Sequence, residues 1–159
     1  MPKMELRHMS RRKKTMLRSD EDIVFEYFRL IKNKDITGLL DLFVDDAVVY
    51  EPFSKSDIQG KTMGLRGKRA IEPFLGVAVM ANEGLRGNVT IDKSDKKTDG
   101  SENRSNQICA IVTFERGERI TARFTFELIS PVNNNSDDDN MKINQKEKKI
   151  KSLRIQFTN

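Results

Sequence analysis

Cysteine and histidine are nearly absent from this chain of 159 residues, which contains one of each. The single cysteine, Cys109, excludes an internal disulfide bond and a cysteine-based metal cluster. The single histidine, His8, lies near the N-terminus and leaves none for a catalytic triad or a zinc site further along. Cys109 lies in an apolar, strand-like run, so we expect a buried, unreactive thiol, no metal or other cofactor, and a reducing cytoplasmic location.

Long apolar runs are also missing. No window approaches the ~18 apolar residues that a membrane-spanning helix needs. No apolar segment follows the first basic residues, so we expect no secretory signal and no membrane span. A hydrophobic fraction of 36% is compatible with a soluble globular chain, and 159 residues suffice for one domain with a core.

The basic residues are concentrated at the N-terminus. Residues 1–19 contain seven Lys or Arg and one Glu, a net charge of +6, and the remainder has 22 basic and 23 acidic residues, a net charge of −1. We therefore expect a basic, disordered leader at 1–18 and a nearly neutral domain at 19–159. The run RRKK favours contact with nucleic acid or an acidic surface. It has no aromatic neighbours, so we do not expect this contact to be the main function.

Helix signals fill the first half of the sequence. Ser19 followed three residues later by Asp22 is a capping-box pattern, and the apolar residues behind it recur on one helical stripe that includes Tyr27. Asp35 is the expected cap of a second, short helix, which Asp45 and Asp46 are expected to end. The predicted helices cover residues 22–33, 36–43 and 67–84, with a strand at 47–51.

Strand signals fill the second half. Four runs rich in Val, Ile, Thr and Phe predict strands at 87–93, 106–116, 118–130 and 148–158. Gly117 predicts a tight hairpin between the middle two. Polar, low-complexity segments separate the others and predict mobile loops at about 93–105 and 131–148. The order predicts an α+β fold in which N-terminal helices cover an antiparallel sheet.

Glu51 is the most informative charged residue. It ends the strand-like run AVVYE and is followed directly by Pro52 and Phe53. One interpretation is a carboxylate in water that simply ends the strand. The other is a carboxylate at the mouth of an apolar pocket, where loss of water contacts raises the pKa of a carboxyl group towards the value that a general base needs.

Two stretches carry a resemblance to a known family. They are KNKDITGLLDLFVDDAVVYEPF (32–53) and GLRGKRAIEPFL (64–75). They resemble the SnoaL-like and ketosteroid isomerase-like family of the nuclear transport factor 2-like superfamily. The resemblance covers about residues 20–75, and beyond it only the strand order agrees. It implies a cone-shaped α+β fold, with a curved mixed or antiparallel sheet wrapped around the N-terminal helices.

The resemblance also implies roles for three positions. Glu51 stands where the isomerases have the acid that moves a proton between carbons, and Tyr27 stands where they have a hydrogen-bond donor to the oxyanion. The third group, a protonated acid, falls near Thr125, a neutral hydroxyl, so we do not expect a fully competent steroid isomerase. Tyr27 is equally consistent with a core tyrosine. The residues expected to line the pocket are Phe43, Tyr50, Phe53, Phe74 and Leu75.

Two classes of function follow. The first is an isomerase- or cyclase-type enzyme that acts on a small apolar carbonyl compound, with Glu51 as the base. The second is a non-catalytic ligand-binding or dimerisation module with the same fold. In both, the expected partners are a small apolar molecule and a second copy of the chain, which binds through the sheet face that includes residues 120–126.

Overall fold

The computed structural model describes residues 18–52, 59–60, 62–82, 86–93, 107–116, 118–130 and 147–158. Most of the predicted leader and most of the two predicted loops therefore lie outside the described residues. The elements are, in chain order, α1 (Asp20–Lys32), α2 (Ile36–Asp41), β1 (Phe43–Tyr50), β2 (Leu65–Arg66), α3 (Lys68–Ala81), β3 (Arg86–Asp92), β4 (Gln107–Arg116), β5 (Glu118–Ile129) and β6 (Lys149–Thr158).

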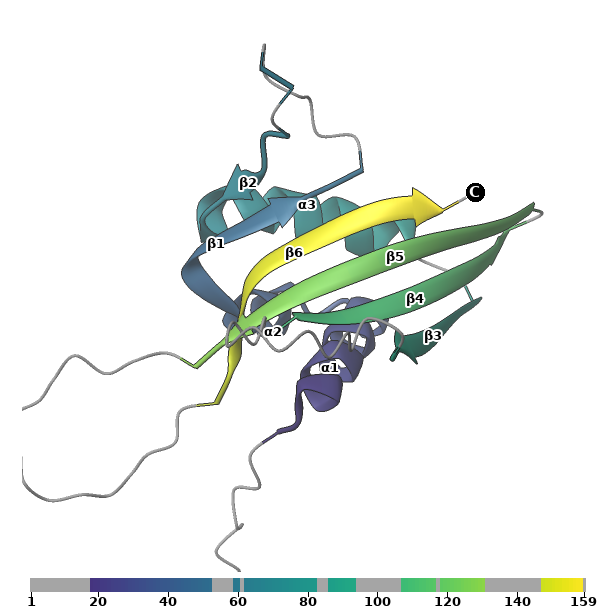
Figure 1. Ribbon diagram of the computed structural model, residues 1–159, viewed down its shortest axis with the longest axis horizontal. Coiled ribbons are helices and arrows are strands. Elements are labelled where there is room, and N and C mark those ends of the chain that lie inside the picture. The colour runs from purple at the N-terminus through teal and green to yellow at the C-terminus, as the bar shows by residue number, and fades with distance from the viewer. Residues whose placement is uncertain are drawn as a thin grey trace, which may run out of the picture.

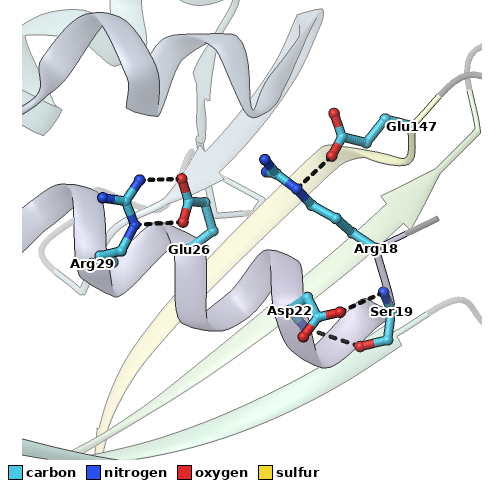
Figure 2. Close-up of polar contacts among 6 residues, drawn as sticks. All are labelled: Arg18, Ser19, Asp22, Glu26, Arg29 and Glu147. Carbon is cyan, nitrogen blue, oxygen red and sulfur yellow. Dashed lines mark hydrogen bonds and ion pairs between the residues drawn. The ribbon is translucent and has the colours of Figure 1, made fainter. Parts of the chain in front are cut away.

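The predicted capping box opens α1. The Asp22 backbone N–H donates to the Ser19 hydroxyl at 3.1 Å, and the Ser19 backbone N–H donates to the Asp22 carboxylate at 2.9 Å (Figure 2). Two ion pairs then connect this end of α1 to the segment that enters β6. Arg18 lies 2.7 Å from Glu147, and Lys148 lies 2.8 Å from Asp20. The start of the first helix is thus fixed to the start of the last strand.

The second helix is shorter than the sequence predicts. Asp35 caps α2 as expected, because its carboxylate accepts a hydrogen bond of 2.8 Å from the Gly38 N–H. The helix ends at Asp41, however, and β1 begins at Phe43. The prediction that the helix continues to Phe43 and ends at the Asp45-Asp46 pair is therefore wrong. Phe43 pairs with Ile150 of β6, and this long-range pairing overrides the local helical pattern.

The sheet has six strands in the order β2-β1-β6-β5-β4-β3. All neighbours are antiparallel except β1 and β6, which are parallel. The predicted hairpin is confirmed, since Arg116 of β4 pairs with Glu118 of β5. Gly117 itself lies outside the described residues. The four strands of the second half begin and end within about one residue of their predicted limits.

The three helices cover one face of this sheet. α3 packs on β1, and α1 contacts β4 further across (Figure 1). α3 continues through Pro73 and buries Ile71 and Leu75 completely. The inner face, towards the helices, carries apolar rows such as Ile155, Phe124, Ala110 and Ile91. The outer face carries a row of Tyr50, Arg154, Thr125, Cys109 and Asp92.

Candidate functional site

A hollow of about 360 Å³ lies beside the C-terminal ends of β1 and β6. This volume is at the lower end of the range for small-molecule sites, about 300–1,000 Å³. Four of its lining residues are apolar or aromatic and four are polar, and more of the exposed lining surface is polar than apolar. The lining residues are Tyr50, Glu51, Pro52, Thr62, Arg154, Ile155, Gln156 and Phe157.

Glu51 lies in this lining as the first residue after β1. It is partly buried, and Pro52 follows it directly and also lines the hollow. The proline ring fixes φ at Pro52 and restricts the backbone of the residue before it. Glu51 is therefore a carboxylate at the edge of a concave site.

Tyr50 and Arg154 form one wall of the hollow. They are partners in the parallel β1–β6 register. The central guanidinium carbon of Arg154 lies 4.3 Å from the centre of the Tyr50 ring. This distance fits a cation–π contact, which is worth about 0.5–1 kcal/mol at an exposed site. The exposed Arg154 side chain is thus held against a ring that itself lines the site.

Tyr27 lies in different surroundings. Its side chain is only 2% exposed, and it packs among aromatic rings of α1, β1 and β5. The distances between ring centres are 5.2 Å to Phe28, 5.4 Å to Phe126, 6.4 Å to Phe43 and 6.5 Å to Phe124. Burial raises the pKa of the Tyr27 phenol, so the hydroxyl keeps its proton at neutral pH. Tyr27 is not part of the lining that contains Glu51.

Thr125 points away from Tyr27. Its neighbours in β5, Phe124 and Phe126, face the Tyr27 ring, and successive side chains of a strand point to opposite faces. Thr125 therefore lies on the outer face, where its hydroxyl oxygen is 3.6 Å from Sγ of Cys109. The prediction of a buried cysteine is confirmed. The structure does not bring Glu51, Tyr27 and Thr125 together in one site.

The five residues predicted to line a pocket have different positions. Tyr50 lines the hollow. Phe43 and Leu75 are completely buried in the core, and Phe74 is partly buried against it. Phe53 lies outside the described residues.

The residues of β6 are those that sequence reasoning missed. Four lining residues, Arg154 to Phe157, come from this strand. The pattern of their own segment predicts a strand but does not show that it pairs with β1. In the described part of the chain, no three His, Cys, Asp or Glu side chains form a group that would hold a metal ion. No helix within the described ranges is long and apolar enough to cross a membrane.

No protein-family model and no curated protein matches the chain. Solved structures do match in shape. A SnoaL-like protein of unknown function from Burkholderia thailandensis is 12% identical with a TM-score of 0.55, over 87% of this chain and 94% of that one. The epoxide hydrolase/cyclase-like enzyme SalBIII has a role in pyran ring formation in the polyether salinomycin. It is 16% identical with a TM-score of 0.52, over 87% of this chain and 89% of that one.

A third match is an NTF2-like protein of unknown function from Cytophaga hutchinsonii, 12% identical with a TM-score of 0.50, over 91% of this chain and 94% of that one. At identities this low, the matches show a shared fold. The activity has to be inferred from the residues of the site. The chain therefore has the α+β cone fold of the NTF2-like and SnoaL-like proteins.

Proposed function

We propose that this protein binds a small, largely apolar molecule in the hollow beside β1 and β6. The observation that carries the proposal is the lining itself, in which Pro52, Ile155 and Phe157 provide apolar surface next to the carboxylate of Glu51. Small-molecule sites commonly combine an apolar wall with a few polar groups that orient the ligand. Phe157 is 49% exposed, so part of its apolar surface faces solvent.

Within this proposal, Glu51 accepts a proton from the bound molecule. A carboxylate beside an apolar wall is suited to remove a proton from a carbon next to a carbonyl group, which is the first step of an isomerase-type reaction and of an aldol-type cyclisation. Tyr27 stays protonated but lies in the aromatic core, and Thr125 lies on the outer face. We therefore assign the acid–base role to Glu51 and a packing role to Tyr27. The second candidate is a non-catalytic ligand-binding module.

Binding is tested with 2-tetralone, an apolar ketone with acidic C–H bonds. Phe157→Ala is expected to weaken binding in a calorimetric titration, because it removes apolar surface from the hollow. The matched control is Phe25→Ala on α1, since Phe25 is 46% exposed and does not line the hollow. Binding that is unchanged by Phe157→Ala would contradict the assignment of this hollow as the ligand site.

Catalysis is tested with the same ketone. Exchange of its acidic hydrogens for deuterium in D₂O is followed by proton NMR, with Glu51→Gln as the variant. General-base catalysis contributes about 10²–10⁴-fold, so we expect a loss of this order with binding retained. Equal rates of exchange in the variant and the wild type would exclude catalysis by Glu51 and favour the non-catalytic ligand-binding module.

The homodimer predicted from the sequence belongs to the same proposal. Within residues 120–126 of β5, three side chains lie on the outer face, away from the three helices: Thr121, Arg123 and Thr125. We expect Thr121→Glu to convert a dimer into a monomer in light-scattering measurements, because two copies of the new charge meet across a symmetric interface. A monomeric wild type would exclude this part of the proposal.

A further inference from the structure

Arg154 differs from the other cationic side chains around it. Arg123 pairs with Asp92 at 3.5 Å, and Lys151 pairs with Glu127 at 3.3 Å. Arg154 lies instead over the Tyr50 ring, and no carboxylate of the described residues forms an ion pair with it. The hollow therefore contains a positive charge that lies over an aromatic ring and forms no ion pair with the described residues.

A guanidinium group held over a ring can still bind a ligand. A cation–π contact uses the flat face of the guanidinium group, whereas its five N–H donors lie in the plane and form a rigid fork. That fork matches the two oxygens of a carboxylate, which it binds through two parallel hydrogen bonds. The contact with Tyr50 thus holds Arg154 in place and does not require its N–H groups as hydrogen-bond donors.

The sides of β6 divide the hollow into a polar and an apolar part. Arg154 and Gln156 are exposed and project from the outer side of the strand, whereas Ile155 and Phe157 project from the inner side. The amide group of Gln156 adds a neutral donor next to the cation. A ligand that fits this division has one charged end and an apolar body.

We propose that the ligand of the hollow is a small carboxylic acid, with its carboxylate on Arg154 and its apolar body against Ile155 and Phe157. This inference rests on the proposed function and adds the chemical class of the ligand. Glu51 belongs to the same lining, so the end of the ligand near Glu51 is uncharged, because a second anion there would be repelled.

Two probes of the same shape test the inference. 2-Naphthoate carries a carboxylate, and 2-naphthamide is its neutral counterpart. Hydrogen bonds to charged groups are the stronger ones, so we expect the wild type to bind 2-naphthoate about tenfold more tightly in calorimetric titrations. Arg154→Gln should abolish this preference, because it weakens the binding of 2-naphthoate much more than that of 2-naphthamide. Arg119→Gln is the matched control, because it removes an equal charge from an exposed residue outside the hollow and should keep the preference.

The outcomes separate the inference from the proposed function. Equal affinity of the wild type for the two probes, or a preference that survives Arg154→Gln, would overturn the inference and leave the binding site in place. If neither probe binds, or if Phe157→Ala does not weaken the binding of 2-naphthamide, both the inference and the proposed function fail. Loss of the preference in Arg119→Gln as well would show a general charge effect and would overturn the inference.

Discussion

The side chain of Val48 occupies the space in which any residue other than glycine at position 64 would place its Cβ atom, and the ring of Tyr50 lies in tight contact with the same space. A Cβ atom at Gly64 would lie 3.0 Å from Cε1 and 3.1 Å from Cδ1 of Tyr50, and it would overlap Cγ1 of Val48. Both neighbours belong to β1, and Tyr50 supports Arg154 in the hollow. The glycine therefore contributes to the site without lining it.

Gly64→Ala is expected to destabilise the protein and to weaken the binding of 2-naphthoate. The added methyl group must displace Val48 or Tyr50, and such overpacking costs about 1–3 kcal/mol. The control is Gly76→Ala in α3, where the new atom would lie 3.9 Å from Ile36, an ordinary contact. That change should stabilise the helix by about 0.5–1 kcal/mol. Urea unfolding measures the free energy of unfolding of both variants. Equal changes in this free energy for the two substitutions would contradict the role of Gly64.

Tyr27 is expected to contribute to stability through its ring. Tyr27→Ala removes a buried ring that contacts four phenylalanines, and such truncations cost about 3–5 kcal/mol. Tyr27→Phe keeps the ring and should reduce the free energy of unfolding much less. Urea unfolding measures both variants. If Tyr27→Phe instead reduced deuterium exchange of 2-tetralone as strongly as Glu51→Gln, the Tyr27 hydroxyl would reach the ligand, and the packing assignment would be wrong.

The Tyr27 phenol also predicts a dependence of stability on alkaline pH. Burial raises its pKa above the ordinary ~10, so the folded state keeps this proton to a higher pH than the unfolded state does. The resulting contribution to stability is fully present below about pH 10 and is lost as the pH rises through the folded-state pKa. Unfolding measured from pH 8 to 11 should show this decrease in the wild type. The decrease should be smaller in Tyr27→Phe, which has no phenol at this position.

The capping box of α1 gives a prediction for the helix start. Ser19→Ala removes the acceptor of the Asp22 N–H, and the loss of an N-cap costs about 1 kcal/mol. Ser19→Asn, which keeps a capping oxygen, is expected to unfold close to the wild type. The thermal midpoints of the two variants provide the measurement. An alanine variant as stable as the asparagine variant would show that the ion pair of Arg18 (Figure 2) and that of Asp20 suffice to hold this end of the helix.

Local signals predict most of the fold. The caps at Ser19 and Asp35 use hydrogen bonds between residues three apart, so the sequence alone identifies them. The strands of the second half follow from runs of β-branched and aromatic residues bounded by polar segments. Phe43 is the exception, because its strand conformation depends on pairing with Ile150 of the last strand, which no local pattern encodes.

The site is less predictable, because it depends on that same pairing. Glu51 stands out in the sequence through its place before Pro52, and it does line the hollow. Arg154 has no such signal, since its contact with Tyr50 joins the first long strand to the last. Thr125 shows the same dependence on register, because the neighbouring strands determine which β5 side chains face the helices.

The parallel pairing of β1 with β6 has a consequence for the order of folding. The two strands that build the hollow are separated by most of the chain, so closing them together carries a large entropic cost. The hairpin of β4 and β5 and the capped first helix depend on nearer neighbours and are able to form earlier. Recognition of a ligand would then be the last property that a newly made chain acquires, after its central hairpin is already in place.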